Sequence, residues 1–261
     1  MTVAVVPLPA TDSRDLATAG QLQRMLLPPS PFTASGWEAA HHFEPAGVVS
    51  GDYVDLVPHG DRLYFMLGDV SGKGVAASML MAQLHAMFRT LIPFQLTLDD
   101  LMARASALLC ASSLPAQYAT LVCGYLGDDG EAVISNAGHP PPLVMTGGGH
   151  VEVRATGVPI GLLCESQFST TRLSLSAADT LLMYTDGLTE ARNAAGEEYG
   201  SRIEAAAARA VHLPVPELLQ AIVAEHAGFR GECANSDDLT LLAVRRVAND
   251  SGTRTEARSC A

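Results

Sequence analysis

The sequence predicts an α+β fold built from antiparallel sheets. Strand-like apolar segments follow one another through short turns, the helical segments come in groups, and strands do not alternate with helices over most of the chain. A doubly wound parallel sheet would need that alternation. With 261 residues, the chain is long enough to bury a substantial core as one large domain or two small ones.

The first element expected is a short helix over residues 13–27. Leucine and alanine recur there at helical spacing, Ser13 can cap the start, and Pro28-Pro29 ends the segment. The apolar stripe of this helix is thin. We therefore expect the helix to pack against the body of the protein or against a second copy of the chain.

Strand patterns begin near residue 37 and continue to residue 70. The last part of this stretch is typical of two strands joined by a turn at Pro58-His59-Gly60-Asp61. Two helices are expected next, over residues 74–92 and 97–113, and Thr97 can cap the second.

The second half of the chain returns to strands. Glycine-rich turns at 127–130 and 147–149 separate paired strands. Two further strands, three helical segments and a last strand are then expected, over residues 171–176, 180–187, 188–196, 201–211, 215–228 and 237–247. We divide the chain into a disordered start with its lead-in helix (1–29), a folded domain (30–247) and a polar, disordered tail (248–261).

The charge balance argues against two classes of partner. Sixteen Lys and Arg against twenty-eight Asp and Glu give a formal net charge of −12. A nucleic-acid binder needs a basic face, and so does a protein held on an anionic membrane by charge. No uninterrupted apolar run reaches the roughly 18–20 residues that span a bilayer. We therefore expect neither nucleic acid nor membrane as a partner.

The cysteines and the N-terminus favour a cytoplasmic protein. The five cysteines, at 110, 123, 164, 233 and 260, are widely spaced and form no Cys-x-x-Cys pair, so neither a zinc site nor a disulfide framework is predicted. Reduced cysteines are expected instead. The first residues lack the basic region of a secretory signal.

Aspartates stand at the ends of apolar strands in four separate segments. These residues are Asp52, Asp69, Asp186 and the pair Asp237-Asp238. If the strand ends converge, the carboxylates repel one another unless a cation neutralises them. Carboxylate oxygens of this kind select Mg²⁺ or Mn²⁺. The pattern therefore predicts a divalent-metal site.

Each aspartate also has a structural interpretation. Asp52, Asp186 and the 237–238 pair all fit ordinary turns when taken singly. Asp69 is harder to explain as structure, because it follows a run that looks buried and an unpaired buried carboxylate is costly. Residues 72–77 match G-x-G-x-x-A, but no βαβ unit follows and no Walker A loop is present, so nucleotide binding is not expected.

Taken together, these segments resemble the metal-dependent protein serine/threonine phosphatases, in the bacterial branch that includes the sporulation phosphatase SpoIIE and the stress-response phosphatase RsbU. The resemblance covers about residues 20–246. The matching segments are LQRMLLP (22–28), VSGDYVD (49–55), GDVSGKG (68–74), NAGHPP (136–141), GVPIG (157–161), TDG (185–187) and DDLT (237–240). Each motif is weak alone, and their order and separations together are specific.

The resemblance implies a fold, a cofactor and a set of ligands. The fold would be a four-layer α-β-β-α sandwich, with two antiparallel sheets between pairs of helices, and the cofactor two Mn²⁺ or Mg²⁺ ions. Asp69 would bridge the ions and act in catalysis with Asp186, and Asp237 is favoured over Asp238 as a direct ligand. The full set of implied ligands is Asp52 (directly or through water), Asp69, Val70 through its carbonyl oxygen, Asp186, Asp237 and Asp238.

Some residues depart from the branch or receive no role. Ser50 stands where the branch commonly has glycine, and Val54 where it usually has an aromatic residue. Lys73 stands where histidine is also common, and we assign it no catalytic role. His139 precedes three prolines in a turn context, which favours a structural role over assistance to a leaving group.

The implied activity is hydrolysis of phosphoserine and phosphothreonine by a metal-activated water, within a catalytic domain over residues 30–247. The implied substrate is a phosphorylated anti-sigma-factor antagonist, and control would come from a regulatory protein or from a homodimer formed through helix 13–27. Two alternatives stay open: a catalytically weak scaffold that binds a partner, and a hydrolase of another phosphoester such as a nucleotide.

Overall fold

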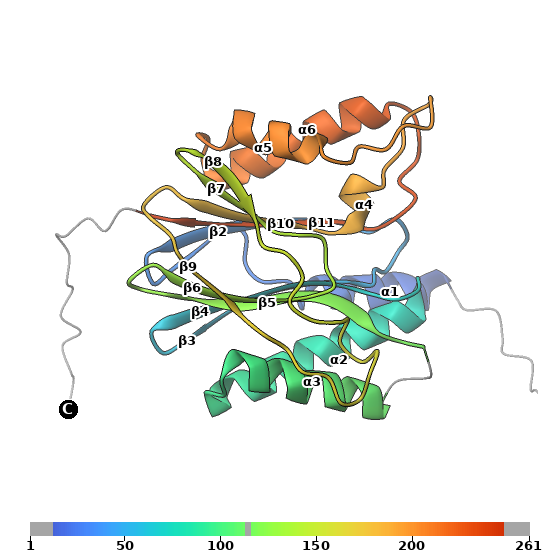
Figure 1. Cartoon of the computed structure of the whole chain (residues 1–261). Helices are drawn as coiled ribbons and strands as arrows, with labels where there is room; N and C mark the ends of the chain where they lie inside the picture. The colour runs from blue at the N-terminus through green and yellow to red at the C-terminus, as the bar shows by residue number, and fades with distance from the viewer. Residues whose placement is uncertain (1–12, 113–115, 248–261) are drawn as a thin grey trace, which may run out of the picture.

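The structure, a computed structural model, describes residues 13–112 and 116–247. Two antiparallel sheets lie face to face, and helices cover the outer face of each sheet (Figure 1). This four-layer arrangement confirms the predicted fold class. The segments expected to be disordered, residues 1–12 and 248–261, lie outside the described residues.

The first sheet has six strands in the order β1-β2-β11-β10-β7-β8. It joins distant parts of the chain, because β2 pairs with β11 from Glu44↔Leu239 to Trp37↔Arg246. Its strands in chain order are β1 (Phe32–Ala34), β2 (Trp37–Glu44), β7 (Leu143–Thr146), β8 (Gly149–Glu152), β10 (Thr180–Tyr184) and β11 (Leu239–Arg246).

The second sheet has five strands in the order β3-β4-β5-β6-β9. The turns predicted at 58–61 and 127–130 connect neighbouring strands of this sheet, and the turn at 147–149 connects β7 and β8 of the other sheet. The strands are β3 (Asp52–His59), β4 (Arg62–Val70), β5 (Ala119–Gly127), β6 (Glu131–Ala137) and β9 (Thr171–Ser174).

Helices form the two outer layers. The five-stranded sheet is covered by α2 (Val75–Leu91), the 3₁₀ turn η1 (Ile92–Phe94) and α3 (Leu98–Ser112), and the six-stranded sheet by α5 (Arg202–Ala210) and α6 (Val215–Arg230). The short α4 (Asp186–Thr189) follows β10, and α1 (Ser13–Arg24) lies beside α2. Thr97 caps α3 as predicted, since its hydroxyl accepts the N–H of Asp100 at 3.4 Å. Helix α1 ends at Arg24 instead of residue 27, because Leu26 N–H bonds to the Gln23 carbonyl in a tighter turn.

Three apolar cores fill the spaces between the four layers. Strand β4 serves two of them, because its side chains alternate between the helix side and the sheet–sheet interface. Tyr64 and Met66 pack with α2 and α3, whereas Leu63, Phe65 and Leu67 pack between the sheets. Burial on both faces explains why β4 is a continuous apolar run, without the alternation of a half-exposed strand.

One sequence expectation about the cysteines is wrong. Cys110 of α3 and Cys164 form a disulfide, with their Cα atoms 5.4 Å apart. The two cysteines are 54 positions apart in the chain, so only the fold brings them together. Cys123 is buried and Cys233 is half-buried, and both are free thiols.

Helix α2 tests the expectation about membranes. Residues 75–94 are long and apolar enough to cross a membrane by length and composition alone. In the fold, the apolar side of this helix packs on the five-stranded sheet through Ala77, Leu80, Met81, Leu84 and Phe88. One side of the helix is thus part of the core, while Val75, Met79 and Phe94 are exposed.

Candidate functional site

The strand ends that carry aspartates meet at one end of the two sheets. In the five-stranded sheet, Asp52 at the start of β3 stands opposite Asp69 near the end of β4. In the six-stranded sheet, the end of β10 pairs with the start of β11, with Tyr184 opposite Leu241. A hydrogen bond from Thr185 to Asp52 connects the two sheets at this end. The predicted convergence of the four segments is therefore present in the fold.

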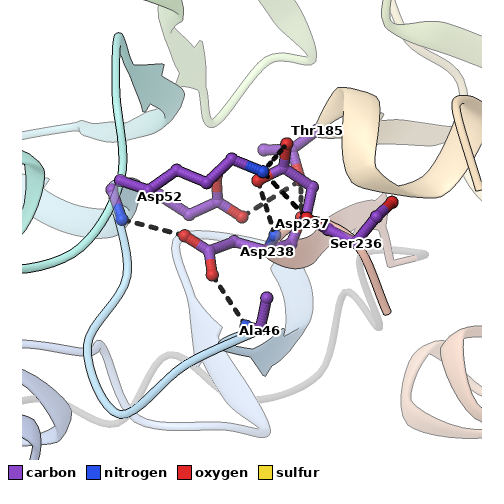
Figure 2. A network of polar contacts seen from close by, with 8 residues as sticks. Ala46, Asp52, Thr185, Ser236, Asp237 and Asp238 are labelled. Carbon is purple, nitrogen blue, oxygen red and sulfur yellow. Dashed lines mark hydrogen bonds and ion pairs between the residues drawn. The ribbon is translucent and has the colours of Figure 1, made fainter. Parts of the chain in front are cut away.

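Asp52 is held between the sheets. Its side chain is 1 % exposed, and its Oδ2 accepts hydrogen bonds from Thr185 Oγ1 at 3.1 Å and Thr240 Oγ1 at 2.5 Å. Burial raises the pKa of this carboxyl well above its usual range, and the nearby Asp69 adds to the rise. The hydrogen bonds from the two hydroxyls each lower this pKa, but by less than burial raises it. Asp52 thus belongs to the inner wall of the cluster (Figure 2).

Asp69 lies close enough to three other carboxylates of the cluster for their charges to act on it. Its pKa is raised to about 7 by desolvation first, and then by the charges of Asp186, Asp237 and Asp238. Lys73 is the group that lowers it. A divalent cation that bound this carboxyl would displace its proton into the solvent.

Asp186 is brought to the cluster by a close approach of two backbones. It opens α4 directly after β10, and its pKa is raised by desolvation, then by Glu190 and Asp237. The next residue, Gly187, lies so close to the segment before β11 that a Cβ on it would be 1.9 Å from the Asp238 carbonyl oxygen. Only glycine fits, so the TDG motif has a steric reason as well as a chemical one.

Asp237 and Asp238 have different surroundings. Both oxygens of Asp238 accept backbone hydrogen bonds, from Ala46 N–H at 2.8 Å and from Gly51 N–H at 2.9 Å. Asp237 instead faces Lys73, whose Nζ lies 2.8 Å from Asp237 Oδ2. Asp238 therefore fixes the loop before Asp52, while Asp237 Oδ2 accepts the ammonium of the exposed Lys73 side chain.

Lys73 is a site residue that sequence reasoning passed over. It is the only lysine of the chain, and its ammonium also donates to the Ser236 carbonyl at 2.8 Å. Its position between two glycines, directly after a candidate ligand segment, was the available signal. Lys73 supplies a positive charge where the acidic side chains gather.

Gln23 is a second residue that sequence reasoning left without a role. It is buried in α1, donates from Nε2 to the Ser50 carbonyl at 2.7 Å, and accepts the Ser50 N–H at 2.9 Å. Gly20 lets α1 approach this loop, since a Cβ there would lie 2.6 Å from the Val48 carbonyl oxygen. A glutamine on the apolar side of the predicted helix was the signal. Helix α1 is thus bonded to the loop that leads into Asp52.

His139 behaves as the structural interpretation expects. It is 3 % exposed, its Nδ1 shares a hydrogen bond with Thr120 Oγ1 at 2.9 Å, and Asn136 Oδ1 accepts its backbone N–H. Desolvation lowers its pKa to about 3. A neutral ring held in this way supports the strand next to Asp69, because Thr120 stands opposite Asp69 in the sheet.

The donor set of the cluster suits a hard divalent cation. Carboxylates from separate segments raise the pKa of Asp69, as expected where a cation would be bound. A Cβ at Gly51 would lie 3.1 Å from the Val70 carbonyl oxygen, so glycine at position 51 leaves the space beside that oxygen open. In residues 13–112 and 116–247, no three acidic, histidine or cysteine side chains stand close enough to share one ion as arranged. Metal binding would therefore require side chains of the cluster to move. Lys73 and Asp237 are exposed and so have room to move.

Known proteins share this arrangement of motifs. The family model for stage II sporulation protein E (SpoIIE) matches residues 59–247. The chain is 29% identical to Protein IcfG of Synechocystis sp., covering 89% of this chain and 41% of that protein. It is 27% identical to Phosphoserine phosphatase RsbP of Bacillus subtilis, covering 67% of this chain and 45% of that protein. The chain thus spans less than half the length of these relatives.

A solved structure agrees with the fold. The structure of the RsbU and RsbW domains of Rv1364c from Mycobacterium tuberculosis is similar with a TM-score of 0.72 at 30% sequence identity. The match covers 85% of this chain and 62% of that chain. The family match begins at the end of β3 and runs through β11.

Proposed function

Because the chain belongs to the SpoIIE family, we propose that it is a metal-dependent phosphoprotein phosphatase that hydrolyses phosphoserine and phosphothreonine. The observation that carries the proposal is the convergence of carboxylates from four chain segments at one end of the sandwich, with the pKa of Asp69 raised to about 7. Such a cluster is costly unless it binds cations. Divalent ions are what a phosphoryl-transfer site without a covalent nucleophile needs.

We assign two Mn²⁺ or Mg²⁺ ions to this cluster. Asp69, the Val70 carbonyl, Asp186 and Asp237 are the groups we expect to hold them directly. Asp238 is a weaker candidate, because both of its oxygens already accept backbone hydrogen bonds. When bound, the ions supply an activated water and neutralise charge on the phosphoryl oxygens.

The chain's own residues prepare that chemistry. Thr185 and Thr240 hold Asp52 by hydrogen bonds from their hydroxyls, so Asp52 is placed to act directly or through a water. Asp238 fixes the loop at Ala46 and Gly51. Lys73 carries a positive charge to the open side of the cluster, where an anionic phosphate would arrive.

The substrate and the regulation are proposed on the family resemblance. The substrate would be a phosphorylated anti-sigma-factor antagonist in a bacterial sigma-factor pathway, in the cytoplasm. The cytoplasmic location no longer has the support of reduced cysteines, because Cys110 and Cys164 are paired. Control would come from a partner or from a homodimer through α1, and the bonds between Gln23 and Ser50 connect that helix to the loop before Asp52.

The test is phosphate release by the purified chain from phosphorylated antagonist candidates and from a phosphoserine peptide, with and without Mn²⁺. We expect Mn²⁺-dependent release, and we expect Asp69→Ala and Asp186→Ala to lose at least about 100-fold of it, as removal of a key charge-stabilising group does. Tight binding of an antagonist without any turnover would instead assign the chain to the scaffold alternative. Faster hydrolysis of nucleotides than of the peptide would overturn the substrate class.

A further inference from the structure

A hollow of about 540 Å³ opens beside the aspartate cluster. Four segments line it: the start of α1, the loop before β3, the start of α2 and the loop before β11. Lys73 and Asp238 belong both to this lining and to the cluster. The hollow is therefore a continuation of the candidate active site toward α1.

The surface of the hollow is mainly apolar. Val48 is 49 % exposed and Val75 is 47 % exposed, and both line it. Leu16 and Val49 add further apolar surface. Exposed valines on two facing segments next to a charged cluster leave apolar surface in contact with water, which a bound side chain would cover.

The charged side chains of the lining favour a ligand whose apolar group lies next to an anionic group. Two charged side chains line the hollow, Lys73 and Asp238. Asp238 accepts two backbone hydrogen bonds, whereas the Lys73 side chain is 64% exposed at the edge shared with the cluster. A ligand with a phosphate at the cluster and an apolar group in the hollow matches this distribution.

We propose that the hollow is a specificity subsite that receives the apolar side chain next to the phosphorylated serine or threonine of the substrate protein. The inference rests on the proposed phosphatase function. Successive residues of an extended chain are about 3.3–3.6 Å apart, so a residue one or two positions from a phosphoserine at the cluster reaches a hollow that shares its wall. A leucine or similar side chain would cover Val48 and Val75.

The test compares two nine-residue phosphoserine peptides and a small aryl phosphate, all with Mn²⁺. One peptide carries leucine at the two positions on each side of the phosphoserine, and the other carries asparagine there. The variant is the double substitution Val48→Thr, Val75→Thr, which keeps side-chain shape and charge and adds hydroxyls. The matched control is Val151→Thr, since Val151 is 58 % exposed on β8, outside the hollow.

The wild-type chain should prefer the leucine peptide over the asparagine peptide about tenfold in kcat/KM, in line with the loss of apolar contact in a pocket. The double variant should lose most of that preference, and its ratio of leucine-peptide to aryl-phosphate kcat/KM should fall about fivefold to tenfold. The Val151→Thr variant should keep both ratios. An unchanged preference in the double variant would overturn the inference.

The outcomes separate the subsite from the activity. If the wild-type chain releases no phosphate from any of the three substrates, the proposed function fails and the subsite with it. If all three are hydrolysed with equal preference by wild type and double variant, only the subsite fails. A double variant that changes the molecular mass in light scattering, with its substrate ratios unchanged, would assign the hollow to a second copy of the chain and also overturn the inference.

Discussion

Individual residues in the cluster differ in what they leave available to a cation. One oxygen of Asp52, Oδ2, accepts two hydroxyls, and both oxygens of Asp238 accept backbone amides. Asp237 Oδ2 accepts the ammonium of Lys73. Lys73 thus occupies an oxygen that a metal would use. We therefore expect the affinity of the cluster for Mn²⁺ to depend on this competition.

Lys73→Met should raise Mn²⁺ affinity about threefold to tenfold, because one nearby positive charge and one competing bond are removed. Stability should change little, since exposed ion pairs contribute about 0–1 kcal/mol. Titration calorimetry of the metal-free protein measures the affinity. Arg192→Met is the matched control, because the Arg192–Glu198 pair is similarly exposed and lies outside the cluster. Weaker Mn²⁺ binding in the Lys73 variant would show that Lys73 positions Asp237 instead of competing for it.

His139 makes stability depend on pH. Its pKa is lowered to about 3 in the fold, against about 6.5 in the unfolded chain, so the unfolded state binds the extra proton between these values. The contribution of the neutral ring is complete above pH 6.5 and is lost as the pH falls toward 3. Between about pH 7.5 and about pH 4.5, the stability advantage of wild type over His139→Asn should shrink by roughly 2–3 kcal/mol.

Denaturant unfolding of both proteins at the two pH values measures this change. His212→Asn, at an exposed histidine, is the control and should show no comparable pH dependence relative to wild type. A stability difference between wild type and His139→Asn that is the same at both pH values would contradict the buried neutral ring.

At the scale of elements, helix α1 and the loop after it decide where the cluster lies. Gln23 satisfies both backbone groups of Ser50, two residues before Asp52. Gln23→Ala should therefore lower both Mn²⁺ affinity and turnover, about tenfold, and cost about 1–3 kcal/mol of stability for the buried groups left unpaired. Gln21→Ala, at an exposed position of the same helix, should change neither. A lower melting temperature with unchanged Mn²⁺ affinity and turnover would limit Gln23 to a structural role.

The contact between the start of α4 and the loop before β11 also sets the position of the cluster, because it brings Asp186 next to Asp237 and Asp238. A Cβ at Gly187 would lie 1.9 Å from a backbone oxygen, so Gly187→Ala must push the two segments apart, at about 1–3 kcal/mol or more. Thermal melting of the metal-free protein tests this. Gly228→Ala in α6 is the control, because nothing lies within 4 Å of its Cβ, and it should stabilise by roughly 0.5–1 kcal/mol. Equal effects of the two substitutions would refute the close approach.

At the scale of the whole molecule, the acidic balance links metal binding to folding. The net charge is −12, and the cluster concentrates part of it at one end of the sandwich. Mn²⁺ at about 100 times its dissociation constant should stabilise the fold by roughly 2.7 kcal/mol. For a domain of this size, that corresponds to a rise in melting temperature of about 5–10 °C.

Differential scanning calorimetry with Mn²⁺ and with a chelator measures the rise. Asp69→Asn should lose most of it, because one of the central carboxylates is neutralised. An unchanged melting temperature in the wild-type chain on addition of Mn²⁺ would contradict the metal site as a whole.

Several features of the fold could be predicted because they are local. The hairpin turns at 58–61 and 127–130, helices α2 and α3 and the cap at Thr97 follow from turn residues and apolar periodicity, which act over a few positions. The family motifs gave the candidate aspartates for the same reason. Each aspartate stands at or near a strand end, where sequence alone shows the change from apolar to polar residues.

Other features were decided only by the tertiary structure, because they join residues far apart in the chain. The Cys110–Cys164 disulfide, the bonds from Gln23 to Ser50 and the separate surroundings of Asp237 and Asp238 depend on segments that meet across the sandwich. The sequence by itself determined which carboxylates stand at strand ends and which family they resemble. Which of those oxygens are already bound by backbone amides, and which remain open to a cation, depends on the packing of two sheets, and packing is a long-range property that no local pattern encodes.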